Sequence, residues 1–218
     1  MEGEESDSPR PGTLAKNRIE ALADGIFAVA MTLLVLDIKL PEGTSFSSDG
    51  ALLSRMLALE HTFVIYLISF IVLGMYWVGH HLQFHFVRYV DQTVLWINLI
   101  FLFGITSVPF ATDLLGDHHQ LRSPYVLYGA ILLMLAALLL MQLWYLERCP
   151  ELASPELTHP VRRRLLGRLA LFSAIPIFSM FAVFYNTRLA LYGYFLLPII
   201  HFLPGHVYQM PRAHSREG

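Results

Sequence analysis

Long uninterrupted apolar runs constrain this chain more than any other feature. No charged residue occurs in the 22 positions from Tyr125 to Leu146, or in the 18 positions from Thr62 to Gly79. A run of about 18 such residues is long enough to cross the hydrocarbon core of a membrane as a helix. Only 15% of the 218 residues are charged, compared with about 25% in soluble globular domains. The sequence therefore predicts an integral membrane protein.

The apolar segments divide into six predicted spans. They lie at 20–40, 62–84, 93–113, 124–146, 165–185 and 188–208. In lipid each backbone N–H and C=O needs an internal partner, which favours helices, and the runs lack the alternating pattern of barrel strands. We therefore expect an all-α membrane protein with a six-helix transmembrane domain at 17–210. An acidic, disordered tail is expected at 1–16 and a short cytoplasmic tail at 211–218.

The basic residues predict the orientation of these spans. With six spans both termini lie on one side, and that side carries 11 of the basic residues, against 4 on the other. The 11 are Arg10, Lys16, Arg18, Arg88, Arg148, Arg162, Arg163, Arg164, Arg168, Arg212 and Arg216, and the 4 are Lys39, Arg55, Arg122 and Arg188. Because basic loops stay in the cytoplasm, both termini are predicted to be cytoplasmic.

The first span has two contrasting faces. At 100° per residue, Val29, Leu33 and Leu36 lie within about 40° of a common stripe, and Thr32 lies at its edge. Asp24 lies on nearly the opposite side. Periodicity alone leaves two interpretations of the aliphatic stripe open, namely contact with lipid or a neighbouring helix, and the wall of a pore.

An acid within the membrane is costly unless it is paired. The second span offers Trp77 and His81 on one helical face, and the third span offers Asn98. Because the spans alternate in direction, these side chains and Asp24 are expected at the same depth, with Arg18 just below them. The sequence predicts a polar cluster that holds the first helix against the next two.

Several other functions find little support in the sequence. The net charge of −2 provides no field that would recruit nucleic acid. His81 and His85 have a spacing suited to zinc, but a zinc site needs a third or fourth ligand that no motif supplies. No nucleotide-binding, nucleophile or metallopeptidase signature occurs. We therefore expect no metal, no cofactor and no enzymatic activity.

The first half of the chain resembles a known family. Residues Arg18 to Leu36 read RIEALADGIFAVAMTLLVL, Tyr76 to His81 read YWVGHH, and Trp96 to Leu99 read WINL. These segments resemble the first three helices of the prokaryotic branch of the transmembrane protein 175 family, which are potassium channels of bacteria and archaea. The chain departs from the family pattern at Leu22 and Ala23, where the family has Phe and Ser.

The resemblance implies a homotetramer in which the first helix of each subunit lines a central pore. The family positions for the constriction and filter fall on Val29, Leu33 and Leu36, with Thr32 as a polar layer. The family's packing network falls on Arg18, Asp24, Trp77, His81 and Asn98. The implied partners are potassium ions and the lipid bilayer, and the implied location is the plasma membrane of a prokaryote.

These observations predict a cation channel that prefers potassium weakly over sodium. An apolar constriction strips part of an ion's water, and potassium gives up its water more cheaply than sodium. One alternative is a proton-coupled secondary transporter in which Asp24 and His81 relay protons. Another is a membrane enzyme that uses His81, His85 and Asp91, for which the sequence holds no matching motif.

Overall fold

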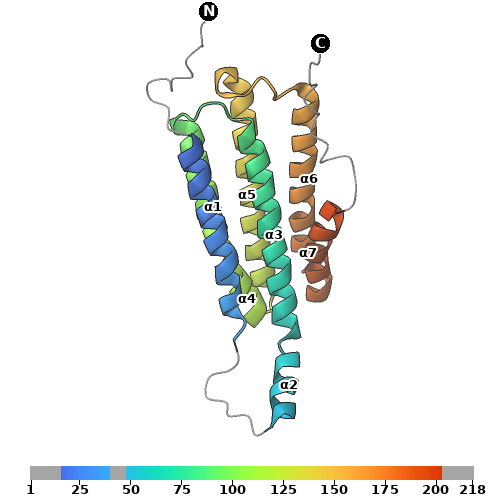
Figure 1. The fold of residues 1–218 in the computed structure, drawn as a ribbon. Coiled ribbons are helices and arrows are strands. Elements are labelled where there is room, and N and C mark those ends of the chain that lie inside the picture. Colours follow the sequence, from blue (N-terminus) through green and yellow to red (C-terminus); the bar gives the residue numbers. More distant parts are fainter. Residues whose placement is uncertain (1–15, 40–47, 203–218) are drawn as a thin grey trace, which may run out of the picture.

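Long antiparallel helices make up the protein, as Figure 1 shows for the computed structural model, which describes residues 16–39 and 48–202. The helices are α1 (Lys16–Leu33), α2 (Asp49–Leu57), α3 (Glu60–His85), α4 (Gln92–Asp117), α5 (Arg122–Arg148), α6 (His159–Ala182) and α7 (Thr187–Phe202). Two short 3₁₀ turns follow α1 and α5, at Leu34–Asp37 and Pro150–Leu152. Within the described residues no strand forms beyond one isolated bridge between Val87 and Ala153. The predicted all-α architecture is confirmed.

Among the described residues, five helices are long and apolar enough to cross a membrane. They are Lys16–Leu36, Glu60–His85, Gln92–Asp117, Arg122–Arg148 and His159–Ala182. The sixth predicted span, 188–208, coincides with α7 up to Phe202, and its last residues lie outside the described part of the chain. The predicted tail at 211–218 and residues 1–15 also lie outside it. Helix α1 begins at Lys16, which the sequence analysis assigned to the end of the first tail.

Two helices differ most from the sequence-based expectation. Helix α2 occupies part of a segment expected to be a loop, and it extends beyond the end of the bundle in Figure 1. The Ser48 side chain caps it by accepting from the Ala51 N–H at 3.2 Å. Helix α6 begins at His159, several residues before its apolar run, and Pro160 occupies its first turn. The α-helix includes Arg162, Arg163 and Arg164. Proline is favoured in the first turn of a helix, so Pro160 suits this early start.

The basic end of the bundle is tied together by its two connections. The Arg88 N–H donates to the Leu152 carbonyl at 2.7 Å, and the Ser154 N–H donates to the Phe86 carbonyl at 2.8 Å. Glu147 at the end of α5 forms an ion pair with Arg162 at the start of α6. These contacts join the α3–α4 turn to the α5–α6 loop.

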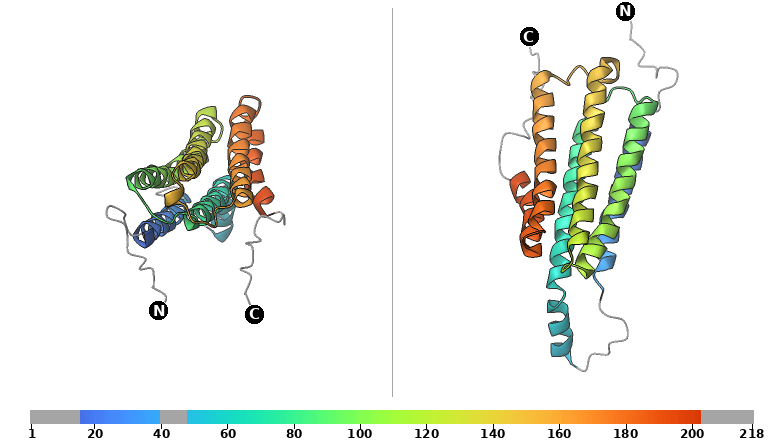
Figure 2. Two further views of the ribbon diagram at one scale, coloured as in Figure 1. Left: turned by 90° about the horizontal axis from the view of Figure 1, so that it is seen from above. Right: turned by 180° about the vertical axis from the view of Figure 1, so that it is seen from behind.

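Helices α1 and α7 lie at opposite edges of the bundle, with α3 between them (Figure 2). Buried hydrogen bonds join the inner helices. The Tyr76 hydroxyl donates to the Leu132 carbonyl at 2.7 Å, and Thr112 donates to the Ser69 hydroxyl at 2.9 Å. In lipid such bonds and close van der Waals packing hold helices together, because the apolar solvent supplies no hydrophobic drive.

Gly129 marks a close junction of α5, α6 and α7. A Cβ atom there would lie 2.5 Å from the Tyr194 hydroxyl and 2.6 Å from Met180 Cγ. We expect Gly129→Ala to lower the free energy of unfolding by about 1–3 kcal/mol, since neighbouring side chains must leave their positions. Thermal unfolding in detergent measures this change.

Gly167 in α6 provides the matched control, because a Cβ atom there meets nothing within 4 Å. Gly167→Ala should leave stability unchanged or raise it slightly, as alanine favours the helix. Equal unfolding temperatures for the two variants would contradict the tight junction at Gly129.

Candidate functional site

Helix α1 buries one narrow face against α3 and α4. Its buried residues are Ile19, Ala23, Phe27 and Ala30, and their spacing of three or four residues places them on one helical face. Ala23 and Ala30 are small and let the helix backbones approach closely. The remaining faces of α1 are therefore left for other contacts.

The predicted stripe lies outside the buried face. Val29, Leu33 and Leu36 are 57%, 43% and 58% exposed, and Thr32 is exposed beside them. The Thr32 hydroxyl donates to the Val29 carbonyl at 2.8 Å, so its hydrogen-bonding need is met within α1. A single subunit thus presents an apolar strip with one threonine that the described helices do not cover.

The predicted helix does not continue as α-helix to residue 40. Helix α1 ends at Leu33, and Leu34 to Asp37 form a 3₁₀ turn. Leu34 is fully buried within this turn while Leu36 remains exposed. The α-helical spacing of 100° per residue therefore applies to Val29 and Leu33, but Leu36 belongs to the tighter 3₁₀ turn.

Asp24 is bonded to α3, as the sequence predicted. The Trp77 Nε1–H donates to Asp24 Oδ1 at 2.8 Å. His81, one turn further along α3, stacks on the Trp77 ring with 5.9 Å between ring centroids. Asp24, Trp77 and His81 are all exposed at the edge of the bundle. The aspartate thus fixes the rotation of α1 relative to α3 without being deeply buried.

A second polar pair lies deeper, and its histidine is His80 rather than His81. The His80 Nε2–H donates to Asn98 Oδ1 at 2.7 Å. Both side chains are buried, at 3% and 0% exposure. Asn98 is predicted to lie with His81, but His81 lies on the exposed face with Trp77. The predicted cluster is thus divided into two separate pairs, Asp24–Trp77 and His80–Asn98.

Aromatic rings enclose His80 on several sides. Phe101 of α4 and Phe84 of α3 stack on it, each with 5.1 Å between centroids. Phe27 of α1 lies 6.2 Å from His80 and 6.1 Å from Phe101. Neither His80 nor Phe27 is among the site residues predicted from the sequence. The signal was there in the spacing of Leu73, Tyr76, His80 and Phe84, which places them on one face of α3.

The other polar candidates have separate roles. Arg18 is exposed near the start of α1. Asp91 caps α4 by accepting from the Val94 N–H at 2.8 Å, and its other oxygen accepts from the Tyr145 hydroxyl at 2.6 Å. Across residues 16–39 and 48–202, no group of three or more His, Cys, Asp or Glu residues is arranged to hold a metal ion. Asp91 therefore has a structural role at a helix start.

Comparison with known proteins agrees with this architecture. The sequence model described as the endosomal/lysosomal potassium channel TMEM175 matches residues 18–109, which include most of α1, all of α2 and α3, and most of α4. A protein from Streptomyces collinus named potassium channel is 31% identical over 188 residues, covering 84% of this chain and 90% of that protein. The chain belongs to the TMEM175 family. This confirms the predicted family, and it is a family of ion channels rather than enzymes.

Two further relatives show how far the likeness extends. A protein from Chryseobacterium sp. strain P1-3, also named potassium channel, is 40% identical over 123 residues, which is 56% of this chain and 60% of that protein. The match thus spans less than two thirds of that relative's length. The crystal structure of a lysosomal potassium-selective channel TMEM175 homolog from Chamaesiphon minutus is 28% identical and has a TM-score of 0.71, covering 85% of this chain and 95% of that one. Both polar pairs fall within the segment that matches the family.

Proposed function

We propose that this chain is a potassium channel of a prokaryotic plasma membrane, with a weak preference for potassium over sodium. One observation carries the proposal. The aliphatic stripe of α1 is left uncovered by its own bundle, and it lies in the segment that matches the TMEM175 family. An apolar exposed face suits lipid as well as a pore, and family membership favours the pore.

The proposed assembly is a homotetramer of six-span subunits. Four copies of α1 surround the central axis, so that Val29, Leu33 and Leu36 each form a ring of four side chains, with Thr32 as a polar layer. The rings narrow the pore and remove part of an ion's water. A filter without carbonyl cages offers few binding sites to an ion, so its selectivity should be weak.

The proposed orientation places the end with the α1 start in the cytoplasm. In the described residues that end carries the starts of α1, α4 and α6 and the ends of α3 and α5 (Figure 1). Its helices and loops hold Lys16, Arg18, Arg88, Arg148, Arg162, Arg163, Arg164 and Arg168, against Lys39, Arg55, Arg122 and Arg188 at the other end. This asymmetry supports the positive-inside orientation.

The polar pairs serve the proposed pore by holding α1 in place. The Trp77 bond to Asp24 sets the rotation of α1, and His80, Asn98 and Phe27 form a rigid support behind it. Arg18 and His81 of the predicted network lie at the rim of this support. Groups that lie behind the pore helix act on conduction by fixing its position.

Reconstitution into liposomes tests the channel directly. Potassium-loaded vesicles with a protonophore should take up protons and lose potassium at a rate well above that of empty vesicles. A sodium gradient in place of potassium should give a smaller flux. A potassium flux no greater than that of empty vesicles would contradict the proposal.

The alternative of a proton-coupled transporter rests on Asp24 as the proton carrier. Asp24→Asn keeps an oxygen that can accept the Trp77 N–H bond but cannot carry a proton. If the carboxylate serves packing, potassium flux should stay within about threefold of wild type. A transporter would lose its dependence on the proton gradient instead.

Asp24→Leu serves as the matched comparison, since it removes the acceptor and leaves the Trp77 N–H unpaired. We expect it to reduce both thermal stability and flux. A wild-type flux that saturates and is stimulated by counter-flow would favour the transporter.

A further inference from the structure

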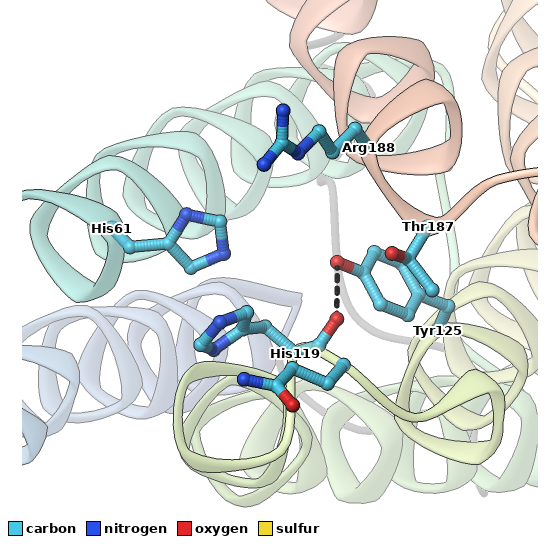
Figure 3. Close-up of a pocket in the computed structure, with 6 residues that line it drawn as sticks. His61, His119, Tyr125, Thr187 and Arg188 are labelled. Carbon is cyan, nitrogen blue, oxygen red and sulfur yellow. Dashed lines mark hydrogen bonds between the residues drawn. The ribbon is translucent and has the colours of Figure 1, made fainter.

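A cavity of about 380 Å³ lies at the end of the bundle away from the α1 start. It is lined by His61, His119, Gln120, Tyr125, Thr187 and Arg188 (Figure 3). These residues come from the start of α3, the α4–α5 turn, and the starts of α5 and α7. The volume is at the lower end of the range of small-ligand pockets, about 300–1,000 Å³. None of these residues belongs to the proposed pore or to its polar pairs.

The side chains of the cavity are rich in donors. In Figure 3 the Arg188 guanidinium and the His61 and His119 rings lie around a shared space, with Tyr125 and Thr187 opposite. The two imidazole rings are close, with 4.2 Å between centroids. His119 Nδ1 donates to the Gly116 carbonyl at 3.3 Å, and the Tyr125 hydroxyl donates to the His119 carbonyl at 3.1 Å. These two bonds fix the wall of the cavity and leave Arg188, Thr187 and His61 to meet a ligand.

One polar atom of the wall is unpaired among the described residues. The His61 Nε2 atom is buried, and in the part of the chain that the structure describes it has no hydrogen-bond partner. A buried polar atom without a partner costs free energy, so a bound group that satisfies it is stabilised in return.

The helix ends add to the positive character. His61, Tyr125, Thr187 and Arg188 each lie in the first turn of a helix. The Arg188 N–H already donates to Asn186 Oδ1 at 2.8 Å, so the Arg188 side chain is what it offers to a ligand. Helix N-termini carry a partial positive charge and favour anions. No carboxylate side chain is among the six that line the cavity. Among the described residues, Glu60 precedes His61 in α3 and interacts with it electrostatically, and Asp113 and Asp117 line a separate pocket beside α3.

We propose that this cavity binds a phosphate-type oxyanion, supplied as a free ion or as a lipid headgroup. Arginine and imidazole N–H groups match the oxygens of such a ligand. A metal cation is disfavoured, because Arg188 would repel it and the cavity offers only two imidazoles. A bound anion would link α3, the α4–α5 turn and α7, and so would hold α7 on the bundle. The binding does not depend on whether the chain conducts potassium.

The test uses the full chain purified in a neutral detergent. Thermal unfolding is followed during titration with inorganic phosphate, with chloride added to keep ionic strength constant. Binding to the folded state raises the unfolding temperature in a saturable way. We expect the shift to appear with phosphate and to be absent with chloride alone.

Two variants and a control locate the site. Arg188→Gln and His61→Phe should each weaken the apparent affinity for phosphate by about tenfold or more, because the first loses the guanidinium charge and the second loses the buried ring N–H. Arg122→Gln removes a charge from the same end without touching the lining. It should leave the titration unchanged.

A second experiment, in lipid nanodiscs, distinguishes a lipid headgroup from free phosphate as the ligand. The protein is placed in nanodiscs of phosphatidylcholine with or without phosphatidylglycerol. A stabilisation by phosphatidylglycerol that Arg188→Gln abolishes, with no response to inorganic phosphate, assigns the site to a lipid headgroup. The proposal is overturned if neither probe stabilises the wild type, or if all three variants respond as the wild type does.

Discussion

Replacing Leu36 by alanine is expected to move the bi-ionic reversal potential, with potassium on one side and sodium on the other, toward zero. The larger opening lets both ions keep more of their water, so the difference in dehydration cost falls. Each tenfold loss in the permeability ratio moves this potential by about 59 mV. Planar-bilayer recordings of the reconstituted protein measure the change, and Leu33→Ala should act in the same direction.

Leu140→Ala is the matched control. Leu140 lies on α5 and is 46% exposed, close to the 43% of Leu33, but it is not on the proposed pore helix. It should leave the reversal potential where it was. If Leu33→Ala and Leu36→Ala also leave the potential unchanged, the assignment of the filter to α1 is wrong.

Replacing Asn98 by leucine is expected to destabilise the protein by about 1–3 kcal/mol, because His80 then keeps a buried donor without a partner among aromatic rings. The double variant His80→Leu/Asn98→Leu removes both polar groups. It should lose less stability than the sum of the two single variants, since no donor or acceptor of the pair is left behind. Thermal or denaturant unfolding in detergent measures all three.

Gln142→Leu replaces another buried amide on an inner helix and serves as the control for the stability measurement. Gln142 is only 1% exposed, and its amide nitrogen has no hydrogen-bond partner among the described residues. Removing this group should leave stability unchanged or raise it. Additive losses in the His80–Asn98 cycle would mean that the two side chains do not stabilise each other.

The sequence predicted the long helices well because lipid imposes them. A charge-free run must be helical, so the prediction of 62–84 lies within α3 and that of 124–146 within α5. Hydropathy does not show where the hydrogen bonds of a helix continue into a polar segment. This is why the early start of α6 through its arginines, and all of α2, were missed.

The polar pairs show a different limit of prediction from the sequence. The sequence supplied Asp24, Trp77 and Asn98, and the bond from Trp77 to Asp24 forms as expected. It could not decide between His80 and His81, because neighbouring residues on a helix point about 100° apart and α3 is apolar on nearly every side. Only the packing of Phe27 and Phe101 against α3 selects which histidine is enclosed.

The 3₁₀ turn at the end of α1 has a geometric consequence for the proposed pore. In an α-helix, side chains three residues apart are offset by about 60° around the axis. In a 3₁₀ turn they eclipse, and each residue advances about 2.0 Å instead of about 1.5 Å. The tighter winding from Leu34 to Asp37 therefore brings Leu36 into line with Leu33, and separates the two side chains slightly along the axis. An ion moving along α1 would therefore pass Leu33 and Leu36 one after the other on the same side of the helix.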